Sequence, residues 1–163
     1  MMFSPALVSL AKTVLDEARG KKLRIACAES CTGGLIAGLL SEIPGASDVL
    51  ERGFVTYSNE AKEELLGVPR ALIAEHGAVS QEVARAMAEG AVAHSRAQLA
   101  VAVTGIAGPA GGTKAKPIGL VHIAARREGR PVLHEEHRFG EIGRTNVRLK
   151  SVEAALLLLR KLL

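Results

Sequence analysis

The sequence is poor in the residues that stack on bases or cross membranes. It contains no tryptophan, one tyrosine and three phenylalanines, whereas proteins that hold single-stranded nucleic acid use aromatic side chains as stacking platforms. No run of residues approaches the roughly 18 uninterrupted apolar residues of a membrane span. The formal net charge is only +4, and lysine and arginine are spread along the chain rather than grouped in a basic block. We therefore expect neither nucleic acid nor a membrane as partner, and a small anion as ligand.

Cysteine is also scarce, and its spacing excludes two further classes of protein. Cys27 and Cys31 lie four residues apart, which suits neither a disulfide framework nor a Cys-x-x-Cys metal or redox motif. The first residues lack the charged, apolar and cleavable parts of a secretory signal, so we expect a cytoplasmic protein with reduced thiols. His134 and His137, three apart on a predicted strand, face opposite sides. No metal site and no cofactor are expected.

Helical and strand-like segments alternate along the 163 residues, of which 48% are apolar. That length suits one domain, residues 1–163, with a buried core. The predicted helices run from Pro5 to Gly20, Leu35 to Leu40, Glu60 to Gly67 with Asn59 as cap, Ser80 to His94, and onward from Thr145 or Asn146. The predicted strands are Leu23–Ala28, Gly53–Tyr57, Leu99–Val103, and a hairpin of Ile118–Ala125 and Val132–Phe139. The pattern predicts an α/β fold, a three-layer α/β/α sandwich with a mixed, mostly parallel sheet.

Three polar or glycine-rich segments follow predicted strands, at residues 28–34, 57–62 and 104–112. In open α/β sheets, ligands bind at the carboxyl ends of the strands. Each segment alone is compatible with an ordinary strand-to-helix turn. Together they predict one crevice lined by all three.

Lys62 is the most informative residue among them, because it falls in the first turn of its predicted helix. The positive end of the helix dipole disfavours an ammonium ion there, so this lysine should lose its proton readily. A neutral lysine beside a hydroxyl can act as general base, and Tyr57, at the end of the preceding strand, would assist the proton transfer. The competing interpretation is a solvated surface lysine.

Two serines are candidate nucleophiles. Ser47 follows a Pro-Gly-Ala turn in which backbone N–H groups, that of Gly45 included, could point at a developing oxyanion; its competing role is helix capping. Ser30 lies in a glycine-rich turn, where its hydroxyl and the amides around Thr32 and Gly33 would equally suit a phosphate at a helix N-terminus. We place Ser47 first and keep Ser30 as the alternative.

The segment at 104–112 superficially resembles a phosphate-binding P-loop. It continues Gly-Thr-Lys rather than Gly-Lys-Ser/Thr, so a nucleoside triphosphatase is not expected. Thr104 opens this segment, and Gly105 and Gly108 would let backbone N–H groups approach a monophosphate. Arg144, at the entry to the last predicted helix, could bind the same phosphate through two N–H groups, the alternative being a surface charge.

Several motifs together resemble one family. They are Ala-Glu-Ser-Cys-Thr-Gly-Gly at 28–34, Glu-Arg-Gly-Phe-Val-Thr-Tyr-Ser-Asn-Glu-Ala-Lys at 51–62, His-Gly-Ala-Val-Ser at 76–80, Thr-Gly-Ile-Ala-Gly-Pro at 104–109 and Lys-Pro-Ile-Gly at 116–119. The chain resembles, over nearly its whole length, the CinA carboxyl-terminal domain family, the nicotinamide-nucleotide amidohydrolases. The resemblance implies metal-free hydrolysis of nicotinamide mononucleotide to nicotinate mononucleotide and ammonia. It also implies a mixed five-stranded sheet between helices and a homo-oligomer, commonly a dimer.

The resemblance further implies roles for individual residues. The nucleophile falls on Ser47, with Lys62 as base, Tyr57 assisting, and the amides of Gly45 and Ser47 facing the oxyanion. The residues that would contact the nucleotide are Ser30, Thr104, Gly105 and Arg144. Many members read Gly-Asp-Arg before the last helix, whereas this chain reads Ile142-Gly143-Arg144, so the arginine is kept and the acid is not. Longer relatives carry an extra amino-terminal domain, which we do not expect here. The alternative function is a nucleotide-binding or regulatory module without catalysis.

Overall fold

The computed structural model describes residues 2–163, which form six α-helices, one short 3-10 helix and one five-stranded sheet. The helices are α1 (Pro5–Gly20), α2 (Leu35–Ser41), η1 (Ala46–Asp48, the 3-10 helix), α3 (Asn59–Leu66), α4 (Arg70–His76), α5 (Gln81–Ala93) and α6 (Arg144–Arg160). The strands are β1 (Ile25–Glu29), β2 (Leu50–Val55), β3 (Leu99–Gly105), β4 (Leu120–Arg127) and β5 (Leu133–Arg138). No helix within residues 2–163 is long and apolar enough to cross a membrane.

The sheet is mixed, with the strand order β2-β1-β3-β4-β5. Strand β1 pairs in parallel with β2 and β3, whereas β3 with β4 and β4 with β5 are antiparallel. The expectation of a mostly parallel sheet was therefore wrong, since the two kinds of pairing occur equally often. The reason is that no helix separates β3 from β4, whereas parallel neighbours are usually joined by a helical crossover.

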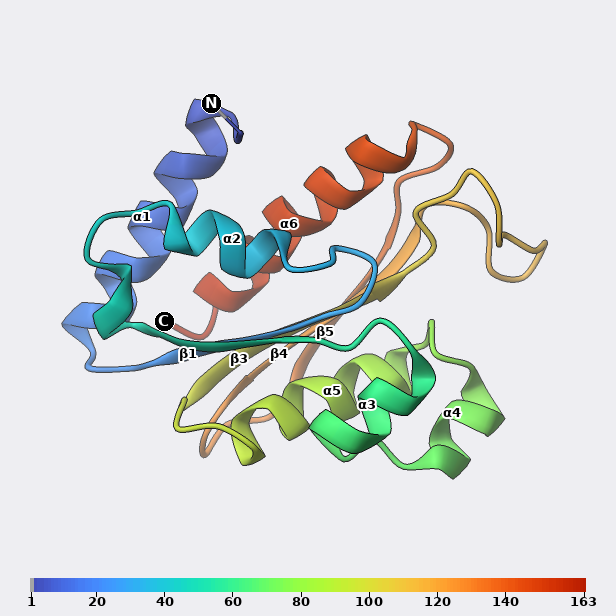
Figure 1. The fold of residues 1–163 in the computed structure, drawn as a ribbon, viewed down its shortest axis with the longest axis horizontal. Helices are drawn as coiled ribbons and strands as arrows, with labels where there is room; N and C mark the ends of the chain where they lie inside the picture. The colour runs from blue at the N-terminus through green and yellow to red at the C-terminus, as the bar shows by residue number, and fades with distance from the viewer. Residues whose placement is uncertain (1) are drawn as a thin grey trace.

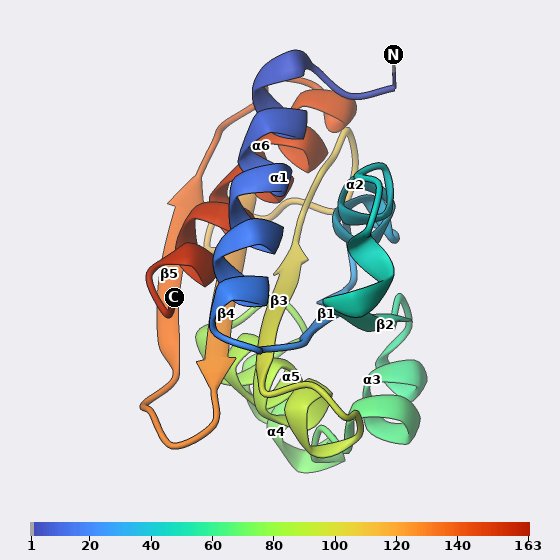
Figure 2. The same ribbon diagram turned by 90° about the vertical axis from the view of Figure 1, so that its left-hand side faces the viewer.

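Helices cover both faces of the sheet. Figure 1 shows α1, α2 and α6 on one side of the strands and α3, α4 and α5 on the other. Seen from the direction of Figure 2, α1 and α6 lie side by side across the strands. The α/β class with five strands, as predicted, is confirmed.

The two faces of the sheet differ in the size of their side chains. In β3 the large residues Leu99, Val101 and Val103 pack toward α1, α2 and α6, while Ala100 and Ala102 pack toward α5. Strand side chains alternate between the two faces, and α5 itself meets the sheet with alanines. Small residues on both partners allow α5 to approach the sheet closely, and α3, which follows β2, packs in turn on α5.

Most element boundaries follow the sequence pattern, with a few differences at the helix starts. Ser4 and Ser80 cap α1 and α5 through their hydroxyls, as predicted. Asn59 was wrong as the cap of α3, because the Ser58 hydroxyl accepts the bond from the Ala61 N–H at 3.0 Å. Helix α6 begins at Arg144, slightly earlier than expected. Helix α4 was not predicted, and it has no side-chain cap to mark its start.

Gly90 of α5 provides a test of the packing that holds α3 in place. A Cβ atom at Gly90 would overlap the carbonyl oxygen of Leu66 in α3, whereas a Cβ at Gly38 of α2 meets nothing within 4 Å. We expect Gly90→Ala to lower the free energy of unfolding by about 1–3 kcal/mol or more through overpacking. Gly38→Ala, the matched control, should be neutral or raise it by about 0.5–1 kcal/mol. Urea unfolding measures both; equal effects would contradict this account of the α3–α5 contact.

Candidate functional site

The three polar segments predicted to line one crevice lie at one edge of the sheet. Ser30 follows β1, Thr56 follows β2, and Thr104 is near the end of β3. Backbone bonds hold these ends together: the Ser30 N–H donates to the Val103 carbonyl at 3.0 Å, and the Thr56 N–H to that of Glu29 at 2.9 Å. The crossovers beyond β1 and β2 run on opposite faces of the sheet (Figure 1), which is where open α/β sheets bind ligands.

Lys62 is buried at this edge and contacts Ser30. Its side chain is 1% exposed, which rules out the solvated surface lysine. The Nζ atom donates to Ser30 Oγ at 3.1 Å and to the carbonyl oxygens of Thr56 at 2.8 Å and Tyr57 at 3.3 Å. Burial lowers the pKa of Lys62, and the nearby Cys31 thiol opposes this shift only in part. No carboxylate within residues 2–163 contributes to that pKa, so an uncharged amine is accessible here.

The start of α3 explains why Lys62 points to this place. Ser58 caps the helix, and Lys62 lies in the first turn, where side chains lean back toward the N-terminus. The Lys62 side chain therefore extends toward Thr56 at the end of β2 and toward Ser30 in the turn after β1. The cap, the helix start and the parallel pairing of β1 with β2 together bring Lys62 to Ser30.

Ser47, the serine ranked first as nucleophile, does not lie beside Lys62, whereas Ser30, the alternative, does. Ser47 belongs to η1, which precedes β2, whereas Lys62 follows β2. The length of β2, about 20 Å for its six residues at ~3.3 Å each, separates the two ends. Ser47 is exposed, and with it Gly45 lies at the opposite edge of the sheet from Ser30.

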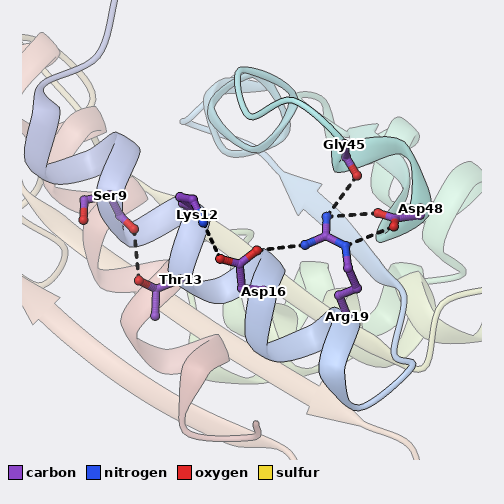
Figure 3. A network of polar contacts seen from close by, with 7 residues as sticks. All are labelled: Ser9, Lys12, Thr13, Asp16, Arg19, Gly45 and Asp48. Carbon is purple, nitrogen blue, oxygen red and sulfur yellow. Dashed lines mark hydrogen bonds and ion pairs between the residues drawn. The ribbon is translucent and has the colours of Figure 1, made fainter.

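Gly45 is instead part of a polar network on α1, drawn in Figure 3. Arg19 Nη2 donates to the Gly45 carbonyl at 3.0 Å, and Arg19 Nε donates to Asp48 at 3.0 Å. Arg19 also donates to Asp16 at 2.8 Å. These contacts connect the turn around Ser47 to α1, and Arg19 takes up the Gly45 carbonyl.

Tyr57 and Arg144 contact each other through their side chains. Arg144, the first residue of α6, donates from Nη2 to the Tyr57 hydroxyl at 3.0 Å and from Nη1 to the Gly108 carbonyl at 2.8 Å. Both side chains are exposed, Tyr57 by 59%. Arg144 also borders a pocket of about 300 Å³, which is lined by Ala107, Pro109, Ile118, Glu141, Gly143 and Arg144. The contact therefore joins the end of β2, the start of α6 and the loop after β3.

The residues at the end of β3 have structural partners of their own. The buried Thr104 hydroxyl donates to the Ala78 carbonyl at 2.9 Å, so its proton is already used. Gly105 lies so close to β4 that a Cβ would be 2.8 Å from a Val121 methyl group. Gly108 has a positive φ of 83°, and its carbonyl binds Arg144. Close packing against β4 is therefore a reason for glycine at position 105 besides ligand approach.

The turn after β1 is closed to a phosphate at the start of α2. The Glu29 side chain is 1% exposed and accepts from the Ile36 N–H at 2.9 Å and the Ala37 N–H at 3.1 Å. The Gly33 N–H donates to the Ser30 carbonyl at 3.0 Å. A carboxylate of the chain itself thus occupies the position where helix N-termini bind anions, and the N–H of Gly33 is not available to a ligand.

Arg148 is a member of this site that the sequence analysis missed. From α6 it donates through Nε to the Cys31 carbonyl at 3.0 Å and through Nη2 to the Thr32 carbonyl at 3.3 Å. A Cβ at Gly33 would be 3.3 Å from Arg148 Nη2, so glycine leaves room for the guanidinium. One signal was present in the sequence: Arg144 and Arg148 are four apart, which places them on one face of a helix.

Cys31 is a poor competitor of the neighbouring Ser30. Burial raises the pKa of the Cys31 thiol to about 11, and only the thiolate is a strong nucleophile. Both cysteines are free and buried. Residues 2–163 contain no group of three His, Cys, Asp or Glu side chains placed to hold a metal ion. The chemically poised pair at this edge is Ser30 with Lys62.

Comparison with known proteins adds the family. The family model for the CinA C-terminal domain matches residues 7–163. A putative competence-damage inducible protein of Caldicellulosiruptor bescii is 47% identical over 152 residues, which cover 93% of this chain and 36% of that protein. A CinA-like protein of Syntrophus aciditrophicus is 51% identical over 143 residues, or 88% of this chain and 34% of that protein. The chain thus spans about a third of the length of these relatives.

Solved structures share the fold over the whole chain. The competence/damage inducible protein CihA from Agrobacterium tumefaciens is 51% identical with a TM-score of 0.96, covering 98% of this chain and 97% of that one. A CinA superfamily protein from Escherichia coli is 31% identical with a TM-score of 0.92, covering 99% and 94%. With the matched family model, these similarities show that the chain belongs to the CinA C-terminal domain family.

Proposed function

We propose that the chain hydrolyses the carboxamide of nicotinamide mononucleotide, with Ser30 as nucleophile and Lys62 as its base. The observation that carries the proposal is the buried amine of Lys62 at 3.1 Å from Ser30 Oγ, with no carboxylate to hold it charged. A lysine desolvated in this way can take the proton of a neighbouring hydroxyl. The choice of substrate rests on the motifs shared with the nicotinamide-nucleotide amidohydrolases.

The proposed reaction transfers the acyl group of the substrate first to Ser30 and then to water. Lys62 accepts the Ser30 proton while Oγ attacks the carboxamide carbon, giving a tetrahedral intermediate. The C–N bond then breaks, Lys62 returns the proton to the nitrogen, and ammonia leaves. Water next attacks the ester on Ser30, releasing nicotinate mononucleotide and restoring the hydroxyl. No metal takes part in these steps.

The nucleotide part of the substrate supplies positioning. Glu29 already accepts the hydrogen bonds of the amides at the start of α2, so we assign the phosphate to Arg144. Arg144 uses two of its five N–H groups on Tyr57 and Gly108, and the others remain for a phosphate. Tyr57 then orients Arg144 through its hydroxyl, in addition to any part in proton transfer. The dimer implied by the family resemblance stays a prediction.

Single substitutions of the two serines separate the candidate nucleophiles. We expect Ser30→Ala and Lys62→Met to lower kcat/KM for nicotinamide mononucleotide by roughly 10³-fold or more, because losing one member of a catalytic pair costs about as much as losing both. Ser47→Ala should remain close to wild type, because Ser47 lies at the other edge of the sheet. Ammonia release is the measurement. Loss of activity in Ser47→Ala with retention in Ser30→Ala would overturn the assignment.

The same assay tests the alternative of a binding module. Wild-type protein that binds nicotinamide mononucleotide in calorimetry but releases no ammonia would favour that module. Release from a different small amide in a substrate panel would identify another amidase. Lys62 argues against a protein that only binds the nucleotide, because binding does not require a buried amine hydrogen-bonded to a serine hydroxyl.

The pH dependence of the reaction follows from the burial of Lys62. Burial lowers its pKa below the ordinary value of 10.5, and only the neutral amine acts as base. The neutral fraction of Lys62 grows as pH rises, so kcat/KM should also rise with pH. It should level off once the pH exceeds the pKa of Lys62, which lies below 10.5. Initial rates between pH 5 and about 10 check this. A rate that falls over this range would contradict the role of Lys62 as base.

Substrate selectivity tests the role of Arg144. Free nicotinamide should be a much poorer substrate than the nucleotide, because remote binding energy is used at the reacting centre. Arg144→Met should reduce the preference for the nucleotide by about 10–100-fold, the effect of losing a charge-assisted contact of ~1.5–3 kcal/mol. The measurement is the ratio of kcat/KM values. Equal use of both substrates by the wild type would refute the phosphate contact.

A further inference from the structure

The turn from Ser30 to Gly34 is held from two sides by charged groups. On one side Glu29 accepts from two N–H groups of α2. On the other side Arg148 of α6 donates to the carbonyls of Cys31 and Thr32 at 3.0 and 3.3 Å. Arg148 thus spans two consecutive peptide groups, those that follow Cys31 and Thr32, a geometry that suits the planar fork of a guanidinium.

The contact with Arg148 fixes the direction of the backbone in this turn. In a trans peptide the carbonyl and the following N–H point in opposite directions. Since the Cys31 carbonyl faces Arg148, the Thr32 N–H points away from it. This N–H has no acceptor among the backbone bonds of residues 2–163 outside helices and strands, and the buried Thr32 hydroxyl has no partner either. Unpaired buried donors are uncommon in folded proteins.

We propose that Arg148 is a positioning residue for Ser30, an inference that rests on the proposed function. By binding the carbonyls of Cys31 and Thr32, Arg148 holds the turn so that the Ser30 hydroxyl stays within hydrogen-bond distance of Lys62 Nζ. It also keeps these two carbonyl oxygens turned away from the oxygen that becomes negative during attack. Preorganised dipoles of this kind stabilise a developing oxyanion without reorganisation. Arg148 itself need not touch the substrate.

The experiment uses a probe that reports on Ser30 without any assumed substrate. A fluorophosphonate phosphonylates an activated serine: the Oγ–P bond forms, the P–F bond breaks, the hydroxyl proton goes to Lys62, and fluoride leaves. Intact mass and peptide mapping give the rate and the site. The variants are Arg148→Ala and Arg148→Lys, with Arg160→Ala as matched control, since Arg160 lies on the same helix in an exposed ion pair with Glu17.

We expect Arg148→Ala to slow phosphonylation of Ser30 and to lower kcat by about 100-fold, within the 10²–10³ range for loss of oxyanion stabilisation. KM should change little. Arg148→Lys should recover only part of the rate, because an ammonium cannot span both carbonyls in the same way. Millimolar guanidinium should restore part of the Arg148→Ala rate and leave Arg160→Ala unchanged. A merely structural role would lower the thermal midpoint without this rescue.

The outcomes separate this proposal from the proposed function. Slower phosphonylation in Arg148→Ala, with rescue, supports positioning even if nicotinamide mononucleotide releases no ammonia, in which case only the substrate is wrong. Wild-type rates in folded Arg148→Ala overturn positioning and leave the proposed function intact. Labelling of Ser47 instead of Ser30 in the wild type overturns both.

Discussion

The arrangement of this site depends on a buried amine held against a hydroxyl without a counter-charge. Lys62 has carbonyl oxygens and Ser30 around its Nζ, and none of these groups carries a full negative charge. Taking an ammonium out of water is costly unless an anion accompanies it. The start of α3, which Ser58 caps, places Lys62 there, and burial lowers the pKa of its amine. A carboxylate at the same place would favour the charged form of Lys62, which could not act as the base under the proposed function.

The packing of the sheet serves this arrangement. The face toward α5 is lined with alanines, so α5 lies close to the strands and α3 lies on α5 at Gly90, where a side chain would overlap Leu66. The position of α3 relative to the end of β1 therefore depends on these small residues. The opposite face carries the larger side chains, and α6 packs there. From that face of the sheet, Arg148 of α6 contacts the turn after β1. Arg144, at the start of α6, contacts Tyr57 and Gly108.

Much of the fold and part of the site could be predicted from the sequence. Helical periodicity, serine caps and the short apolar run of β3 indicated the right kinds of elements. The Gly-rich and polar segments after β1, β2 and β3 follow strands that are neighbours in the sheet. Local turn chemistry alone placed Ser47 before Ser30 as candidate nucleophile, and it carried no information on which serine lies beside Lys62. Residues 44–48 precede a strand that is parallel to β1, and this places them at the edge away from Lys62. Arg148 lies more than a hundred residues from Cys31 in sequence, and its spacing from Arg144 indicates a shared helix face but not this partner.

The Glu29 carboxylate decides how a nucleotide can lie in the crevice under the proposed function. Glycine-rich turns after the first strand of α/β proteins commonly present the amides of the next helix to a phosphate. Here those amides are bonded to Glu29, and an additional anion would meet a buried negative charge. The phosphate must then lie away from α2, whereas the carboxamide has to reach Ser30. A substrate that joins the two extends from Ser30 toward Arg144, across the Tyr57 hydroxyl. Under the proposed function, Glu29 next to Ser30 thus excludes the phosphate from this turn and leaves the turn to the carboxamide of the substrate.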